Sequence, residues 1–121
     1  MRIEFFLLVA WISLVSASVS PGVDQFFEQH AGKFKGKKIG LIVNQTSVDS
    51  KMCSTLSRFL EMSPEISVSA IFSPEHGIKG QQYAWESVPD GKEGGIPVHS
   101  LHGKTRRPSA AMLKGLDAIV Y

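Results

Sequence analysis

Four stretches of the chain have the length and apolar character of β-strands. Residues 39–43 form a continuous apolar run, which fits a strand buried on both faces as in a parallel sheet. Residues 66–72 alternate between apolar and smaller or polar side chains, and residues 97–101 and 118–121 form two further short runs. Polar residues follow the first three runs, so the pattern predicts strands whose ends carry polar loops.

Apolar residues at helical spacing occur before and after the first of these strands. One helix is predicted from Val23 to His30 with Gly32 as its stop, and His30 is interpreted as a partly exposed helix residue. A second helix should end before Ser63, and we expect its apolar stripe to belong to the core. That stripe consists of Met52, Leu56, Phe59 and Leu60.

A third, short helix is predicted between Ser109, its cap, and Gly115, whereas residues 89–95 are predicted to be a loop. Strands that alternate with helices indicate a parallel sheet with right-handed crossovers. The sequence therefore predicts an α/β fold: a Rossmann-like, mostly parallel sheet with flanking helices, truncated after about four strands.

Composition narrows the class of protein. The chain has 121 residues, enough for at most one domain, and 43% hydrophobic with 20% charged residues is typical of a globular protein. A net charge of +2 without a basic block argues against nucleic acid as a partner. Cys53 is the one cysteine, so it forms no internal disulfide and is expected to be a small buried residue. Glycine-rich nucleotide motifs are missing, and we predict no cofactor.

The first 17 residues are typical of a secretory signal peptide. An apolar run over residues 5–15 is followed by small residues, which predicts cleavage after Ala17. The run is too short to span a bilayer comfortably, so we expect the mature form to have no membrane association. The chain is expected to be exported to the periplasm or the medium.

The turn after the second predicted strand holds an acid and an imidazole. Pro74 should end the strand because it cannot donate to a sheet ladder, and Gly77 and Gly80 allow a tight turn. Glu75 and His76 would then stand at the carboxyl end of a strand, where open α/β sheets bind ligands. An ordinary loop uses the same residue types, so both interpretations stay open.

Other polar and aromatic residues could complete a ligand site at this edge. Asn44 and Gln45 follow the first strand, where they either hydrogen-bond within the loop or contact a polar ligand. Tyr83 and Trp85 either stack on a sugar or cover the end of the sheet. Lys104 belongs to a basic loop after the third strand.

Histidines near the third predicted strand could indicate a zinc site. His99 and His102, with His76 and Glu75, are residue types that bind this metal. Positions three apart on a strand face opposite sides, however, so His99 and His102 would not converge without a turn. We predict no metal site.

Three motifs occur in an order and at a spacing that resemble one bacterial family. The motifs are residues 40–46 (GLIVNQT), 74–80 (PEHGIKG) and 96–108 (IPVHSLHGKTRRP). With them the chain resembles the exo-β-N-acetylmuramidase family of peptidoglycan recycling, formerly DUF1343, and the resemblance runs from about Gly22 to the last residue.

The chain departs from this family in three ways. His102 stands where a Tyr is usual, and the loop over residues 89–95 is shorter. Family members also continue after the fourth strand with an Asp-containing segment and a second, smaller domain. Residues 18–121 are therefore expected to be the N-terminal portion of a Rossmann-like catalytic domain.

The resemblance implies a glycoside hydrolase that releases terminal N-acetylmuramic acid from peptidoglycan fragments, weak or inactive as this chain alone. It places the catalytic carboxylate on Glu75, which agrees with the need of glycoside cleavage for an acid that protonates the departing oxygen. A glutamate in a partly dry crevice can have its pKa raised enough to hold that proton. Glu86 is the best second carboxylate in this chain, and His76 would orient substrate, tune Glu75 or cap the turn.

Binding roles follow from the same resemblance. Asn44, Gln45 and Lys104 are candidates for holding the hydroxyls, the acetamido group or the lactyl carboxylate of a muramic-acid-containing saccharide. Two alternatives stay open. One is a non-catalytic sugar-binding module in which Tyr83 and Trp85 matter most, and the other is an inactive gene fragment with an unpaired sheet edge.

Overall fold

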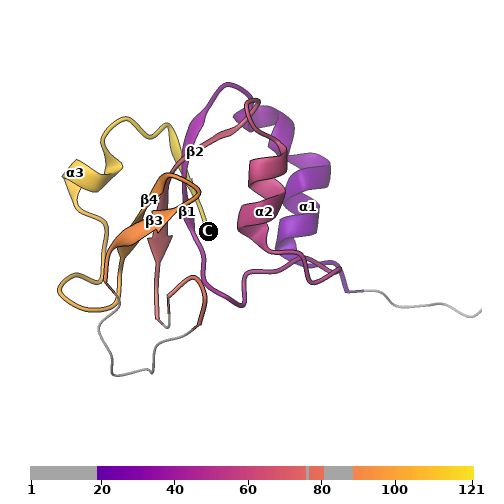
Figure 1. The fold of residues 1–121 in the computed structure, drawn as a ribbon. Helices are drawn as coiled ribbons and strands as arrows, with labels where there is room; N and C mark the ends of the chain where they lie inside the picture. The colour runs from indigo at the N-terminus through magenta and orange to yellow at the C-terminus, as the bar shows by residue number, and fades with distance from the viewer. Residues whose placement is uncertain (1–18, 76, 81–88) are drawn as a thin grey trace, which may run out of the picture.

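The computed structural model describes residues 19–75, 77–80 and 89–121, with helices on both sides of one sheet (Figure 1). The helices are α1 (Gly22–Gln29), the 3-10 helix η1 (Ala31–Phe34), α2 (Thr55–Glu61) and α3 (Ala110–Leu113). The strands are β1 (Lys38–Ile42), β2 (Ser67–Ser73), β3 (Gly91–Glu93), β4 (Ile96–Ser100) and β5 (Ala118–Val120).

The sheet has the strand order β3-β4-β2-β1-β5. β1 pairs in parallel with β2 and β5, and β2 pairs in parallel with β4, whereas β3 runs antiparallel to β4. Counted along the chain, the parallel strands stand in the order third, second, first, fourth, with which a doubly wound sheet begins. The predicted α/β fold with a mostly parallel sheet and flanking helices is confirmed.

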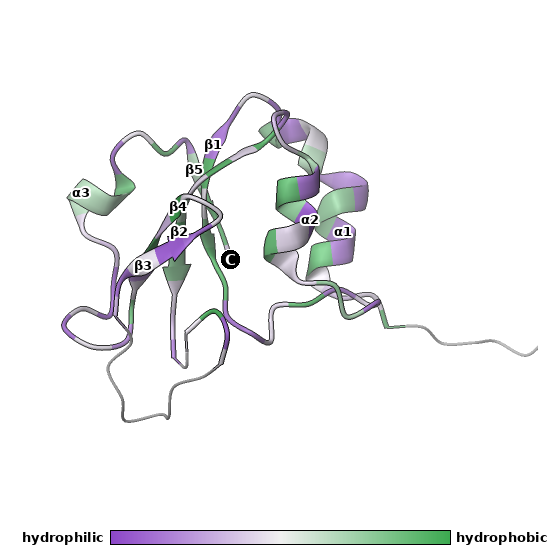
Figure 2. Ribbon diagram, viewed as in Figure 1, coloured by the Kyte–Doolittle hydropathy of each residue, from purple (hydrophilic) through white to green (hydrophobic). Residues whose placement is uncertain are grey.

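α1 and α2 together cover one face of the sheet and form the main core. The ring centroids of Phe26 and Phe27 lie 5.2 and 4.8 Å from that of Phe59, which is fully buried. Ile39 and Leu41 of β1 belong to the same cluster and are also fully buried. Figure 2 shows both helices banded with hydrophobic and hydrophilic residues, as expected for helices with one buried face.

The other face of the sheet packs near α3. The Phe72 ring is fully buried and stacks on the imidazole of His99, with centroids 5.6 Å apart. A Cβ at Gly40 would stand 2.7 Å from Cε2 of Phe72 and 2.9 Å from Cδ1 of Leu116. β1 therefore approaches these two side chains closely because residue 40 has no side chain.

A cluster of charges joins α1, α2 and the loop before α2. The Asp49 carboxylate is buried and accepts hydrogen bonds from the backbone N–H groups of Lys51 and Cys53, both at 2.8 Å, and from Arg58. Arg58 also lies 3.5 Å from the carboxylate of Asp24 in α1. Burial raises the pKa of Asp49, but the hydrogen bonds from Arg58, Cys53 and Lys51 outweigh it and hold the pKa below its ordinary value.

The buried apolar stripe of α2 is shorter than the sequence predicted. Leu56 and Phe59 are buried, but Met52 precedes α2 and is 77% exposed, and Leu60 is 42% exposed. Met52 has a φ of 63°, so the backbone turns there and does not continue the helical spacing. Cys53 is exposed rather than buried, because it lies in this turn and not on the inner face of α2.

The predicted loop over residues 89–95 contains strand β3. Gly94 and Gly95 join β3 to β4 with φ values of 56° and 85°, which makes a two-residue hairpin. α1 ends at Gln29, earlier than predicted, and η1 fills the interval before β1.

The predicted signal peptide lies outside the described residues. No helix in the described part of the chain is long and apolar enough to cross a membrane.

Candidate functional site

The carboxyl ends of β1, β2 and β4 lie on one edge of the sheet because these strands are parallel. Backbone hydrogen bonds continue the ladder past the strand ends. The Val43 N–H donates to the Phe72 carbonyl at 3.1 Å, and the Leu101 N–H donates to the Ser73 carbonyl at 2.8 Å. The polar segments that follow the three strands are therefore neighbours, as the sequence predicted.

The segment after β2 forms the predicted tight turn. The Gly77 N–H donates to the Pro74 carbonyl and the Gly80 N–H to the Gly77 carbonyl, both at 3.4 Å. Gly77 and Gly80 have φ values of 72° and 63°, in the left-handed region that glycine adopts most readily. Ser73 ends the strand and is fully buried. Glu75 therefore follows a buried strand end closely and lies at the carboxyl edge of the sheet.

Asn44 and Gln45 use their side chains differently. The Asn44 side-chain oxygen accepts hydrogen bonds from the backbone N–H and the hydroxyl of Thr46, at 3.0 and 2.7 Å. The loop role that the sequence left open is therefore confirmed for this oxygen. Gln45 is exposed and lies against Gly80, since a Cβ at Gly80 would stand 2.8 Å from Cγ of Gln45. Gln45 thus connects the loop after β1 with the turn after β2.

A hollow of about 520 Å³ adjoins these two segments. Asn44 and Gln45 line it together with Ile78 and Lys79 of the turn. Lys79 Nζ lies 3.5 Å from Oε2 of Glu93, so an ion pair joins the turn to β3 beside the hollow. Polar groups mixed with apolar surface suit a small polar ligand. The other described lining residues are Val43, Ser47, Ser54, Leu56, Ser57, Leu60, Glu93 and Gly94.

Glu75 lies outside this hollow. Its side chain is exposed, and within the described part of the chain its carboxylate has no ion pair or hydrogen bond. The described residues thus do not form the partly dry crevice that we expected around a proton donor. The other predicted catalytic and aromatic site residues lie outside the described residues, so their roles stay predictions. These are His76, Tyr83, Trp85 and Glu86.

The loop after β4 carries Lys104, which is exposed and does not line the hollow. Ser100 is buried at the end of β4, where its N–H donates to Asp90 Oδ1 at 2.7 Å and its hydroxyl donates to the His102 carbonyl at 3.0 Å. Sequence reasoning missed Asp90, which links the start of β3 to the end of β4. Its signal was the Pro-Asp-Gly turn before β3.

A metal centre does not emerge from the described residues. Among them, no group of three His, Cys, Asp or Glu side chains is placed to hold a metal ion. His99 stacks on the ring of Phe72 instead, at the face of the sheet near α3. His76, which the zinc hypothesis also used, lies outside the described residues.

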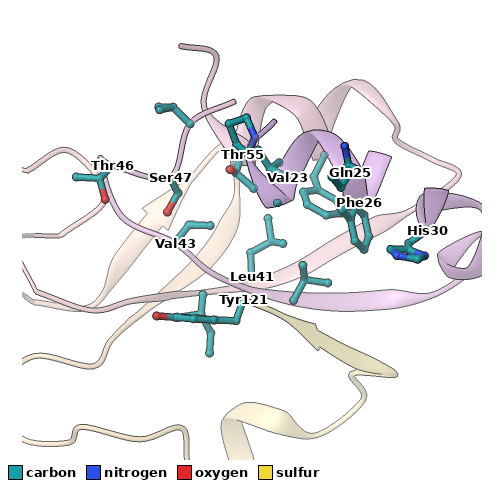
Figure 3. A pocket seen from close by; sticks show the side chains of 16 residues that line it. Val23, Gln25, Phe26, His30, Leu41, Val43, Thr46, Ser47, Thr55 and Tyr121 are labelled. Atoms are coloured by element: carbon teal, nitrogen blue, oxygen red, sulfur yellow. The ribbon is translucent and has the colours of Figure 1, made fainter. Parts of the chain in front are cut away.

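A second hollow, of about 490 Å³, lies between α1, β1 and the end of β5 (Figure 3). The described residues that line it include Phe26, Leu41 and Val120 but no Asp, Glu, Lys or Arg. Glycoside cleavage requires a carboxylic acid. The described lining of this hollow therefore supplies no group for that chemistry, and the candidate site remains at the turn after β2.

Comparisons with known proteins relate the chain to a family of enzymes. Residues 39–121 match a family model described as the N-terminal part of the exo-β-N-acetylmuramidase NamZ. Over 105 residues the chain is 36% identical to the peptidoglycan β-N-acetylmuramidase NamZ of Bacillus subtilis, an alignment that covers 85% of this chain and 25% of that protein.

A solved structure gives the same result. The crystal structure of a DUF1343 family protein from Bacteroides fragilis superposes with a TM-score of 0.69 at 39% sequence identity. The match covers 84% of this chain and 25% of that one. The chain therefore spans about a quarter of the length of the relatives that it matches.

Proposed function

Because the chain belongs to the exo-β-N-acetylmuramidase NamZ family, of which residues 39–121 match the N-terminal part, we propose that it serves the hydrolysis of peptidoglycan fragments. The observation that carries this proposal is the 36% identity to the peptidoglycan β-N-acetylmuramidase of Bacillus subtilis. The reaction would release a terminal N-acetylmuramic acid. The substrate would be a muramic-acid-containing saccharide.

In this proposal Glu75 is the general acid that protonates the departing glycosidic oxygen. Its support is position: it lies in the Pro-Glu-His-Gly turn at the carboxyl edge of a parallel sheet, two residues after the buried Ser73. Glycoside cleavage usually needs a second carboxylate, and Glu86 is our candidate within this chain. His76 would orient the substrate or Glu75.

Binding groups are proposed on both sides of the turn. Gln45 lies against Gly80 and lines the 520 Å³ hollow, so its amide group is available to a sugar placed there. The Asn44 side-chain oxygen is used within its loop, which leaves its NH₂ group as the donor for a hydroxyl or acetamido oxygen. Lys104 would pair with the lactyl carboxylate, and Tyr83 and Trp85 would stack on the sugar ring.

We further propose that the isolated chain has weak activity or none. Glu75 is exposed, and a proton donor works best where neighbouring atoms exclude water. The matched relatives are about four times as long, and the crevice around Glu75 would be completed by the part that this chain does not match.

The signal-peptide pattern of the first 17 residues supports export of the protein, which N-terminal sequencing of the mature protein would test.

The test of the catalytic role is a fusion in which residues 18–121 replace the matched region of the Bacillus subtilis relative. Release of N-acetylmuramic acid is followed with a chromogenic glycoside. Glu75→Gln should lower kcat by about 10²–10⁴-fold, as expected for loss of a general acid. Glu61→Gln is the matched control. Glu61 is an exposed carboxylate at the end of α2, near the amino ends of the strands and not near the carboxyl ends where Glu75 lies.

Two outcomes contradict this function. Unchanged turnover of the Glu75→Gln fusion would remove Glu75 from the catalytic role. A folded fusion that binds the saccharide without cleaving it would favour the second candidate, a sugar-binding module. Calorimetric titration of the saccharide into both variants separates these outcomes.

A further inference from the structure

The hollow beside the turn after β2 reflects how the chain passes from β2 to β4. Parallel neighbours are usually joined by a helix that covers the face of the sheet. In the described part of this connection, the turn over residues 77–80 and the hairpin of β3 and β4 take that place. The hollow of about 520 Å³ lies between these segments and α2, since Ile78, Gly94 and Leu60 line it. Its volume is in the range of small-molecule sites.

The described lining of this hollow contains one cation and one carboxylate, which form an ion pair. Lys79 Nζ lies 3.5 Å from Oε2 of Glu93, and the two side chains are 65% and 38% exposed. Exposed ion pairs contribute little to stability, so Lys79 can exchange Glu93 for another anion at little cost. A ligand carboxylate at about 2.7–2.9 Å would be the better partner. The hollow therefore offers a cation that its own carboxylate holds only loosely.

Neutral hydrogen-bonding groups line the same space. Ser54 Oγ donates to Ser57 Oγ at 2.8 Å, and the Ser57 hydroxyl has no acceptor of its own among the described residues. The side-chain amide of Gln45 is also without a hydrogen-bond partner among them. Val43 and Leu56 add apolar surface. Such a mixture suits a sugar, which has hydroxyl groups as well as C–H faces, and Lys79 suits an acidic substituent on it.

We infer that this hollow binds a sugar that carries a carboxylate, and that Lys79 determines the selectivity by pairing with this carboxylate in place of Glu93. The inference rests on the proposed function, in which the sugar is N-acetylmuramic acid and the carboxylate is that of its lactyl group. Glu93 is then an internal competitor for Lys79. Lys104, the other candidate for the lactyl carboxylate, does not line the hollow.

Lys79 and Glu75 belong to one turn, which relates the binding site to the proposed chemistry. Lys79 follows Glu75 by four residues, a stretch that spans at most about 14 Å when extended. The hydrogen bond from the Gly77 N–H to the Pro74 carbonyl and that from the Gly80 N–H to the Gly77 carbonyl fold this stretch into turns. Both long side chains can therefore contact one sugar unit.

The test is calorimetric titration of two compounds into the full chain: N-acetylmuramic acid and its methyl ester, which has the same sugar but no charge. The acid should bind at least about tenfold more tightly, as expected for a hydrogen bond to a charged group. Lys79→Met should abolish this preference, and Lys79→Arg should retain it because arginine keeps the charge. Lys104→Met is the matched control, since Lys104 is an exposed lysine outside the hollow, and it should leave the preference unchanged.

Glu93→Gln separates selectivity from a structural role of the ion pair. Loss of the competing carboxylate should tighten binding of the acid by about two- to fivefold, the range that an exposed ion pair contributes. Lys79→Met and Glu93→Gln should therefore act in opposite directions. An ion pair that only supports the turn would make both variants weaken binding.

The same variants in the fusion described above distinguish this inference from the proposed function. There Lys79→Met should raise KM by at least about tenfold with little change in kcat, because the carboxylate is bound before and during the reaction. A fusion that cleaves the glycoside with an unchanged KM after Lys79→Met would overturn the inference and leave the function in place. So would equal binding of acid and ester, no binding of either to the folded chain, or a preference that Lys104→Met abolishes. Binding of the acid through Lys79 in a fusion without turnover would uphold the inference and overturn the function.

Discussion

The close packing of β1 against Phe72 predicts how much Gly40→Ala lowers the free energy of unfolding. Gly40 lies in a buried strand, and the added Cβ would stand 2.7 Å from Phe72 Cε2 and 2.9 Å from Leu116 Cδ1. Both distances are shorter than carbon atoms tolerate, so a neighbour must move. Leu116 is partly exposed and can turn its terminal methyl group away, but the Phe72 ring is fully buried and stacked on His99.

Two opposing contributions determine the size of the effect. Overpacking a well-packed core costs about 1–3 kcal/mol. Replacing a glycine whose φ is not positive with alanine stabilises the folded protein by about 0.4–1 kcal/mol, because it reduces the conformational entropy of the unfolded chain. Gly91→Ala in β3 isolates the second contribution, because a Cβ there meets no atom within 4 Å. The free energies of unfolding of the two variants should therefore differ by about 1–3 kcal/mol.

Urea unfolding followed by circular dichroism measures this difference. With a slope of about 1–3 kcal/mol per molar urea, the Gly40→Ala midpoint should lie roughly 1 M below that of Gly91→Ala. Equal slopes would show that both variants unfold in the same way. Equal midpoints would refute the close approach of β1 to Phe72, and with it the reason for a glycine at this position.

Three further predictions concern the core, the charge cluster and the turn. Phe59→Ala should lower the free energy of unfolding by about 3–5 kcal/mol, seen in thermal denaturation, because the ring is fully buried. The lowered pKa of Asp49 gives stability that is present near neutral pH and lost as the pH falls below about 4, so Asp49→Asn should reduce the difference between urea midpoints at these two pH values. Gly80→Ala should cost about 1–2 kcal/mol, since its φ is 63°, and should shift the amide resonances of Gln45 in NMR spectra.

Strands with apolar side chains were predictable, and one strand without them was not. The continuous run at β1 requires cover on both faces, and the structure provides α1 and α2 on one face and Phe72 with Leu116 on the other. β3 has no apolar residue, so hydrophobic pattern does not reveal it. The Gly94-Gly95 pair was its signal, because two residues with positive φ form the tight hairpin that starts β4.

The start of α2 shows how local hydrogen bonds override periodicity. Met52 stands at helical spacing from Leu56, but the Asp49 carboxylate holds the preceding loop in a turn through the Lys51 and Cys53 N–H groups. The helix then begins after Ser54, whose hydroxyl accepts a hydrogen bond from the Ser57 N–H at 3.0 Å. Spacing alone contains no information on such a turn, which depends on a side chain folded back onto its own backbone.

The location of the candidate site was predictable from the sequence, whereas its side-chain geometry was not. Parallel strands end at one edge, so the segments after β1, β2 and β4 had to be neighbours. Which atoms are available there depends on local bonds: the Asn44 oxygen closes its own loop, whereas Gln45 packs on Gly80. Periodicity specifies neither choice.

Glu75 follows the inner strand β2 and lies outside the core, so its role can be tested without loss of the fold. β2 lies between β1 and β4, and its last three residues, Ile71 to Ser73, are fully buried. The turn therefore leaves from a buried inner strand, and rigid elements position functional groups best. The Glu75 carboxylate itself is exposed and makes no contribution to the core. Glu75→Gln should therefore leave the urea midpoint unchanged, so that a fall in kcat reports on chemistry rather than on folding.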